Sequence, residues 1–102
     1  MPQLGQIHSA RRDDTCLFQL TGEFDLSNAW KIQDALFEAI EHEDRDIVVD
    51  LTAVRFMDAQ LVRVLVQARE AAVRRDIAFV IVPPKDRVVS RVAGLVDFDI
   101  AA

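Results

Sequence analysis

Hydrophobic and polar residues alternate near the start of the chain, as they do in strands with one buried face. The segment 15–21 predicts a strand, and the segment 4–10 predicts an edge strand beside it. Asp13 and Asp14 supply the turn between the two segments, and Gly22 is expected to end the second. The inner face of segment 15–21 consists of Cys16, Phe18 and Leu20.

The spacing of the apolar residues then changes to three and four, which predicts a helix. Ser27 is its expected N-cap residue, and a polar segment, EHEDRD, ends it. The inner face of this helix consists of Ala29, Ile32, Leu36 and Ile40. The β-branched run 47–51 follows, and a short continuous apolar run is typical of a strand buried on both faces.

A second helix is predicted over 59–75, followed by a strand over 77–82 that two prolines end. The inner face of this helix consists of Leu61, Leu65, Ala68 and Ala72, with Val64 beside them. A third helix, which runs to Ala93 and is followed by Gly94, and a short last strand over 97–100 complete the prediction.

Strands that alternate with helices predict an α/β fold whose sheet is mostly parallel and is packed by about three to four helices. The opening hairpin makes this sheet mixed. The chain has 102 residues, of which 51% are hydrophobic and 28% are charged. One domain over residues 1–102, built on one core, is therefore expected.

The formal charge of −5 narrows the choice of partners. An acidic surface repels phosphate backbones and anionic lipids, which argues against nucleic-acid binding and membrane-surface attachment. No apolar run approaches the roughly 20 residues that span a bilayer, and no signal peptide is recognisable. A single cysteine, Cys16, fits a reducing compartment, so a cytoplasmic protein is expected.

Few residues suggest catalysis. Three dispersed glycines cannot form a phosphate-binding loop, and no nucleophile, base and orienting group come together. Cys16 points toward the predicted core, so we interpret it as a buried thiol rather than a nucleophile. His42 lies within EHED and is interpreted as part of a solvated helix end rather than as a metal ligand. We therefore expect a protein without catalytic activity, cofactor or metal.

The segment 50–61 differs from the rest of the chain. It runs from the buried strand through a hydrophobic loop into the second helix. Asp58 can cap that helix and meet the positive end of its dipole. Two interpretations stay open: Asp58 is a cap alone, or it is a cap within a surface that docks another protein.

The chain resembles the STAS domain family over nearly its whole length. The resemblance rests on LTGEFDLSNAWKIQDAL, on IVVDLTAVRFMDA, which is the most specific motif, and on VVSRVAGLVDF. It implies the fold shared by anti-sigma-factor antagonists and the cytoplasmic part of sulfate transporters. Antagonists of the regulated kind typically carry Asp-Ser-Ser/Thr-Gly at the junction, and an anti-sigma serine kinase phosphorylates the first serine.

The residues that match this motif are Asp58, Ala59, Gln60 and Leu61. Ala59 has no hydroxyl, so phosphoryl transfer to its side chain is chemically excluded. A phosphate there would add about −2 charge beside Asp58 and drive partners apart. Thr52 is either a substitute phosphorylation site or a structural turn hydroxyl, and Ser27 and Ser90 are weaker candidates.

The first two predicted helices carry apolar side chains beside their inner faces: Val62, Val66 and Val73, with Arg69 among them, on the second helix, and Trp30 and Phe37 on the first. Each set either widens the core or contacts a partner. The expected docking patch consists of Asp58, Ala59, Gln60, Val62, Arg63 and Val66. Asp25 is expected to border this patch, because the loops after parallel strands gather at one edge of the sheet.

The resemblance implies two functions from different classes. In the first, the chain is a non-catalytic regulatory protein that binds an anti-sigma factor of the serine-kinase type. It thereby controls sigma-factor activity without phosphorylation at Ala59. In the second, the chain is the STAS subunit of a membrane complex that transports lipids or anions. The sequence leaves the partner's identity and homodimer formation open.

Overall fold

The computed structural model describes residues 5–43 and 45–85. The described elements are β1 (Gln6–Arg12), β2 (Thr15–Phe24), α1 (Ala29–His42), β3 (Asp46–Met57), α2 (Ala59–Arg74) and β4 (Phe79–Val82). Two helices are thus described where the sequence predicts about three to four. The predicted third helix and the predicted strand over 97–100 lie outside the described residues.

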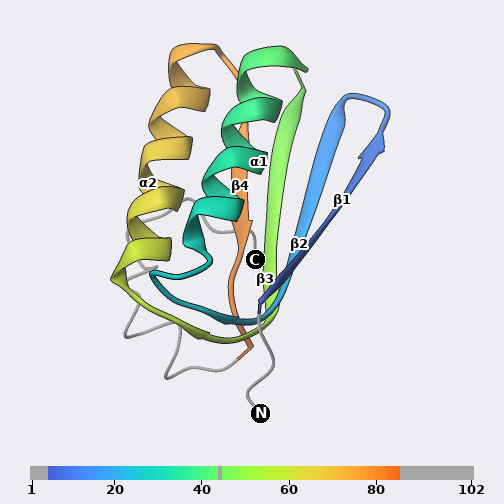
Figure 1. Ribbon diagram of the computed structural model, residues 1–102. Helices are drawn as coiled ribbons and strands as arrows, with labels where there is room; N and C mark the ends of the chain where they lie inside the picture. The colour runs from blue at the N-terminus through green and yellow to red at the C-terminus, as the bar shows by residue number, and fades with distance from the viewer. Residues whose placement is uncertain (1–4, 44, 86–102) are drawn as a thin grey trace.

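The strands of the described residues form one sheet in the order β1-β2-β3-β4. β1 pairs with β2 in antiparallel orientation, and the other two pairings are parallel. The hairpin turn uses Asp13 at φ 53°, a left-handed conformation that aspartate tolerates. α1 and α2 lie side by side on one face of the sheet, with both N-termini at the same edge (Figure 1). The predicted fold class is confirmed.

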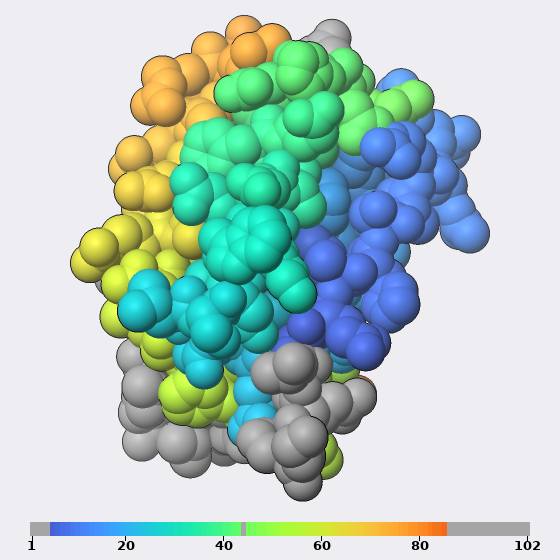
Figure 2. Space-filling model, viewed as in Figure 1, coloured from blue at the N-terminus to red at the C-terminus, as the bar shows by residue number. Residues whose placement is uncertain are grey.

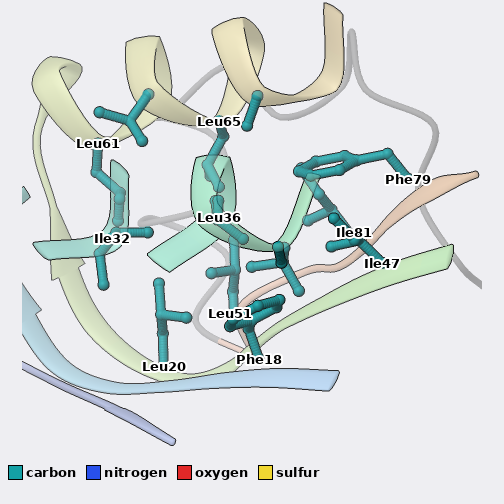
Figure 3. Packing of buried hydrophobic residues seen from close by; sticks show 14 of the residues in the cluster. Phe18, Leu20, Ile32, Leu36, Ile47, Leu51, Leu61, Leu65, Phe79 and Ile81 are labelled. Carbon is teal, nitrogen blue, oxygen red and sulfur yellow. The ribbon is translucent and has the colours of Figure 1, made fainter. Parts of the chain in front are cut away.

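The core lies between this face of the sheet and the two helices (Figure 3). Every predicted inner-face residue of β2, α1 and α2 is buried, with an exposed fraction of at most 6%. The other strands add Ile47, Val49, Leu51, Phe79 and Ile81. Burying one large apolar side chain contributes about 1.5–3 kcal/mol, so this layer fixes both helices on the sheet.

Two strands continue beyond their predicted ends. Gly22 does not end β2, because glycine adopts φ 94° at an irregularity in the pairing with β3 and the strand continues to Phe24. β3 continues past Leu51 to Met57, because its later residues still pair with β2. The two strands consequently end side by side.

The other two strands differ less from their predicted bounds. β1 is shifted toward the hairpin turn and ends at Arg12, because it pairs with β2 up to Thr15. β4 begins at Phe79 rather than at Ile77. The Ile77 N–H bonds to the Ala72 carbonyl at 2.9 Å, so Ile77 still belongs to the turn that closes α2.

The prediction that β3 is buried on both faces is wrong. Its burial alternates, because both described helices lie on one face of the sheet. Ile47, Val49 and Leu51 are completely buried under the helices, whereas Val48 and Asp50 on the other face are half-buried. β-branched residues at both kinds of position hide this alternation in the sequence.

Candidate partner-binding site

The C-terminal ends of β2 and β3 bring two segments together at one edge of the sheet (Figure 1). Phe24 and Met57 are register partners, and the N–H of Asp58 donates to the carbonyl of Phe24 at 3.2 Å. Asp25 follows Phe24 directly and is exposed. The loop between β2 and α1 therefore borders the start of α2.

Asp58 caps α2, as the sequence predicts. Its backbone is extended, and its Oδ1 accepts hydrogen bonds from the N–H groups of Gln60 at 2.9 Å and Leu61 at 3.4 Å. These are two of the donors that the first turn of a helix cannot pair internally. The carboxylate also lies at the positive end of the helix dipole, where negative charge is favourable.

Asp58→Ala is expected to lower the free energy of unfolding by about 1 kcal/mol, because both cap hydrogen bonds are lost. Asp58→Asn keeps an oxygen acceptor in the same place and is expected to cost much less. Urea unfolding of both variants measures the difference. Equal losses for the two variants would show that the charge, rather than the acceptor geometry, stabilises the start of α2.

The outer side of the first turns of α2 faces solvent. Ala59, Arg63 and Val66 are exposed, and Gln60 and Val62 are half-buried. Val62 packs against the core, so it widens the core. Val66 and Val73, at 39% and 62% exposure, do not. Of the apolar side chains beside the inner face of α2, one thus widens the core, and the other two remain available for contact with a partner.

Two exposed apolar side chains at this edge of the sheet were not identified from the sequence. Leu26 is 71% exposed and Phe56 is 48% exposed, whereas Met57 is buried. The predicted hydrophobic loop is wrong, because β3 runs through Phe56 and ends only one residue before Asp58. Alternation along the chain gave no signal for Phe56, because burial does not alternate at the end of β3, where Leu51, Val54 and Met57 are the buried residues.

We call the exposed and half-buried residues at this edge the junction surface: Asp25, Leu26, Phe56, Asp58, Ala59, Gln60, Val62, Arg63 and Val66. It contains every residue of the predicted docking patch together with Leu26 and Phe56. It combines exposed or half-buried apolar side chains with the N-cap residue and the first turns of α2.

The loop between β2 and α1 is held by its own side chains. The predicted N-cap, Ser27, is wrong: Asn28 is the N-cap residue of α1. Asn28 is buried, where its Oδ1 accepts from the Asp25 N–H at 2.9 Å and its Nδ2 donates to the Glu23 carbonyl at 3.0 Å. Asp25 Oδ1 accepts from the hydroxyl and N–H of Ser27, and these bonds lower the pKa of Asp25.

Thr52 lies in β3 rather than in a turn. Its Oγ1 donates to Asp50 Oδ1 at 2.7 Å, and its N–H donates to the same oxygen at 2.9 Å. The side chain is half-buried. A kinase would have to break this local pairing to reach the hydroxyl, so the geometry favours the structural interpretation of Thr52.

Within residues 5–43 and 45–85, no group of three or more His, Cys, Asp or Glu side chains could hold a metal ion. Cys16 is buried, and its desolvation raises the pKa of the thiol, which disfavours the nucleophilic thiolate. His42 is exposed at the end of α1. In the same part of the chain, no helix is both long and apolar enough to cross a membrane.

The family model of the STAS domain matches residues 6–99. The chain belongs to the STAS domain family. The match covers every residue of the junction surface, so Asp58 and Ala59 lie within the STAS domain. No curated protein matches the chain in sequence.

Solved structures of other proteins share this fold at low sequence identity. An anti-sigma factor antagonist from Mycobacterium paratuberculosis has a TM-score of 0.79 and 18% identity, over 95% of this chain and 85% of that one. The phosphorylated Bacillus cell fate determinant SpoIIAA has a TM-score of 0.75 and 17% identity, over 96% and 89%. The murine anion transporter Slc26a9 has a TM-score of 0.66 and 10% identity, over 89% of this chain but 16% of that one.

Proposed function

We propose that this STAS domain is a non-catalytic regulatory protein that binds an anti-sigma factor of the serine-kinase type in the cytoplasm. Binding would free a sigma factor from the anti-sigma factor and so control transcription. The observation that carries the proposal is the exposed first turn of α2, with Ala59 on it, at the same edge as exposed Leu26 and Phe56. The fold shared with anti-sigma factor antagonists supports this class of partner.

The composition of the junction surface suits protein binding. Leu26 and Phe56 are among the most exposed large apolar side chains of the described residues. Covering them with a partner would contribute about 1–2 kcal/mol each, which is the scale of interface anchors. Asp58 at the cap of α2 and Arg63 in its first turns supply one charge of each sign for orienting the partner.

The interaction is proposed to be independent of phosphorylation at the junction. The methyl group of Ala59 offers no oxygen to a kinase, and the hydroxyl of Thr52 is bonded to Asp50. A regulated antagonist is released when a phosphate adds about −2 charge to this region. We propose that this chain stays competent to bind and that its abundance or its partner carries the signal.

Affinity capture from the native cell, followed by mass spectrometry, tests the partner class. The tagged chain is expected to retain a serine-kinase-like anti-sigma factor. Recovery of a permease and an ATPase instead would establish the alternative, a STAS subunit of a lipid- or anion-transport complex. The genes next to this one give an independent check of the same alternative.

A phosphotransfer assay with the captured kinase and ATP tests the absence of the switch. No phosphate is expected on the natural chain, whereas Ala59→Ser is expected to accept one. Stoichiometric phosphorylation of the natural chain at Thr52 or elsewhere, with release of the kinase, would contradict the proposal.

A further inference from the structure

A second surface runs along the outside of α1. The buried residues of α1 lie on one side of the helix, and the opposite side carries an indole and three carboxylates at spacings of four, four and three. We call this set the Trp30 face: Trp30, Asp34, Glu38 and Glu41, all of them exposed. α1 crosses one broad side of the molecule, where its outer surface is open to view (Figure 2).

Trp30 is 56% exposed, although a Trp side chain usually buries most of its large apolar surface. The Nζ atom of Lys31 lies 5.9 Å from the centroid of its ring. A cation at this distance is attracted by the π-system, so the ring already attracts the ammonium group of Lys31. A guanidinium group from another molecule could stack on the rest of the indole.

The carboxylates of the Trp30 face have few countercharges. Among the described residues, Asp34 has no ion pair, and Glu38 and Glu41 approach only His42, at 3.9 and 3.8 Å. Arg75 reaches α1 at the carbonyl of Glu41 rather than at a carboxylate. The negative charges of these three carboxylates are therefore available to a ligand.

We infer that the Trp30 face binds an arginine-rich segment of a second protein. Arginine combines stacking on an indole with bidentate pairing to carboxylates, and Asp34 and Glu38 lie one and two helical turns beyond Trp30. The three acidic side chains repel nucleic acids and anionic membranes and attract basic peptides. The surface needs neither Ala59 nor an anti-sigma factor, so it goes beyond the proposed function.

The chain offers its own probe for this inference. Trp30 is the single tryptophan and there is no tyrosine, so intrinsic fluorescence reports on the Trp30 face. The full chain is titrated with a helical peptide that presents arginine at every third or fourth position, and with the same peptide carrying glutamate instead. We expect a saturable change in Trp30 emission with the arginine peptide alone, and a weaker affinity as salt is raised.

Two double variants of equal charge locate the binding site. Asp34→Asn with Glu38→Gln removes two carboxylates of the Trp30 face and is expected to weaken arginine-peptide binding about tenfold. Asp13→Asn with Glu70→Gln removes two exposed carboxylates elsewhere and is expected to change the affinity less than twofold. Thermal unfolding verifies that both variants are folded.

The inference is overturned by any of three results: no saturable binding of the arginine peptide, equal binding of the glutamate peptide, or equal losses in the two double variants. Failure here leaves the proposed function intact, because the peptide titration contains no anti-sigma factor. Conversely, failure of the affinity capture leaves the result of the titration unchanged.

Discussion

Ala59→Glu is expected to lower the affinity of the chain for the proposed anti-sigma factor partner about a hundredfold without destabilising the fold. Ala59 is the first residue of α2 and is exposed at the centre of the proposed contact. A glutamate there would place an unpaired carboxylate beside Asp58 within a desolvated interface. Such a charge costs about 2–5 kcal/mol, and about 2.7 kcal/mol corresponds to a hundredfold change in affinity.

The same substitution is expected to leave the free energy of unfolding unchanged or to raise it by a few tenths of a kcal/mol. The first turn of α2 contains no acidic residue, and a carboxylate at a helix N-terminus interacts favourably with the dipole. Binding should therefore weaken while stability is unchanged or slightly higher, which separates an effect on the interface from an effect on folding.

Calorimetric titration of the anti-sigma factor measures the first effect, and urea unfolding measures the second. Ala10→Glu is the matched control, because it introduces the same side chain at an exposed position of β1, away from the junction surface. It is expected to bind like the natural chain. An Ala59→Glu variant that is folded and binds with unchanged affinity would remove the junction surface from the contact.

Leu65→Ala is expected to give the largest loss of stability, about 3–4 kcal/mol. Leu65 is completely buried, and its side chain points from α2 toward Leu36 in the core (Figure 3). Replacing Leu65 by alanine removes buried apolar surface and leaves a cavity between the two helices. The helices cannot move together far enough to fill this cavity, because both are packed on the sheet. For a domain of this size, each kcal/mol lowers Tm by about 4–8 °C, so the expected fall is about 12–30 °C.

Val66→Ala is the control for this prediction. Val66 is the next residue of α2, but 39% of it is exposed and its loss opens no core cavity. The expected cost is below about 1 kcal/mol. Equal losses at the two positions, measured by thermal unfolding, would mean that Leu65 is not a packing contact of the core.

The periodicity of apolar residues was sufficient to predict the two described helices and the faces they bury. The inner-face residues of α1 and α2 recur at spacings of three and four, and such spacing is a property of the helix alone. Along β2, the alternation of apolar residues likewise predicted the buried face, which consists of Cys16, Phe18 and Leu20. Asp58 was also predictable, because capping depends on residues that are close in sequence.

Strand ends were predicted less well. A glycine after an alternating run, such as Gly22, predicts the end of a strand. Here β2 continues, because β3 keeps pairing with it beyond the irregularity. Ser27 is a residue type that is preferred at the N-cap. The N-cap of α1 is instead Asn28, whose buried side-chain amide makes two hydrogen bonds within this loop. The first error arises because a partner strand from another part of the chain decides where β2 ends. The second arises within the loop itself, because Asn28 bonds to Asp25 and Glu23, three and five residues before it.

The sequence by itself determined the order of the described elements, the buried faces of β2, α1 and α2, the cap of α2 and the absence of a hydroxyl at residue 59. Only the tertiary structure decided that β2 and β3 end side by side and that Leu26, Phe56 and Trp30 remain exposed. The reason is physical: periodicity and capping act over one or two helical turns. Whether an apolar side chain is covered depends instead on which distant segments of the chain pack against it.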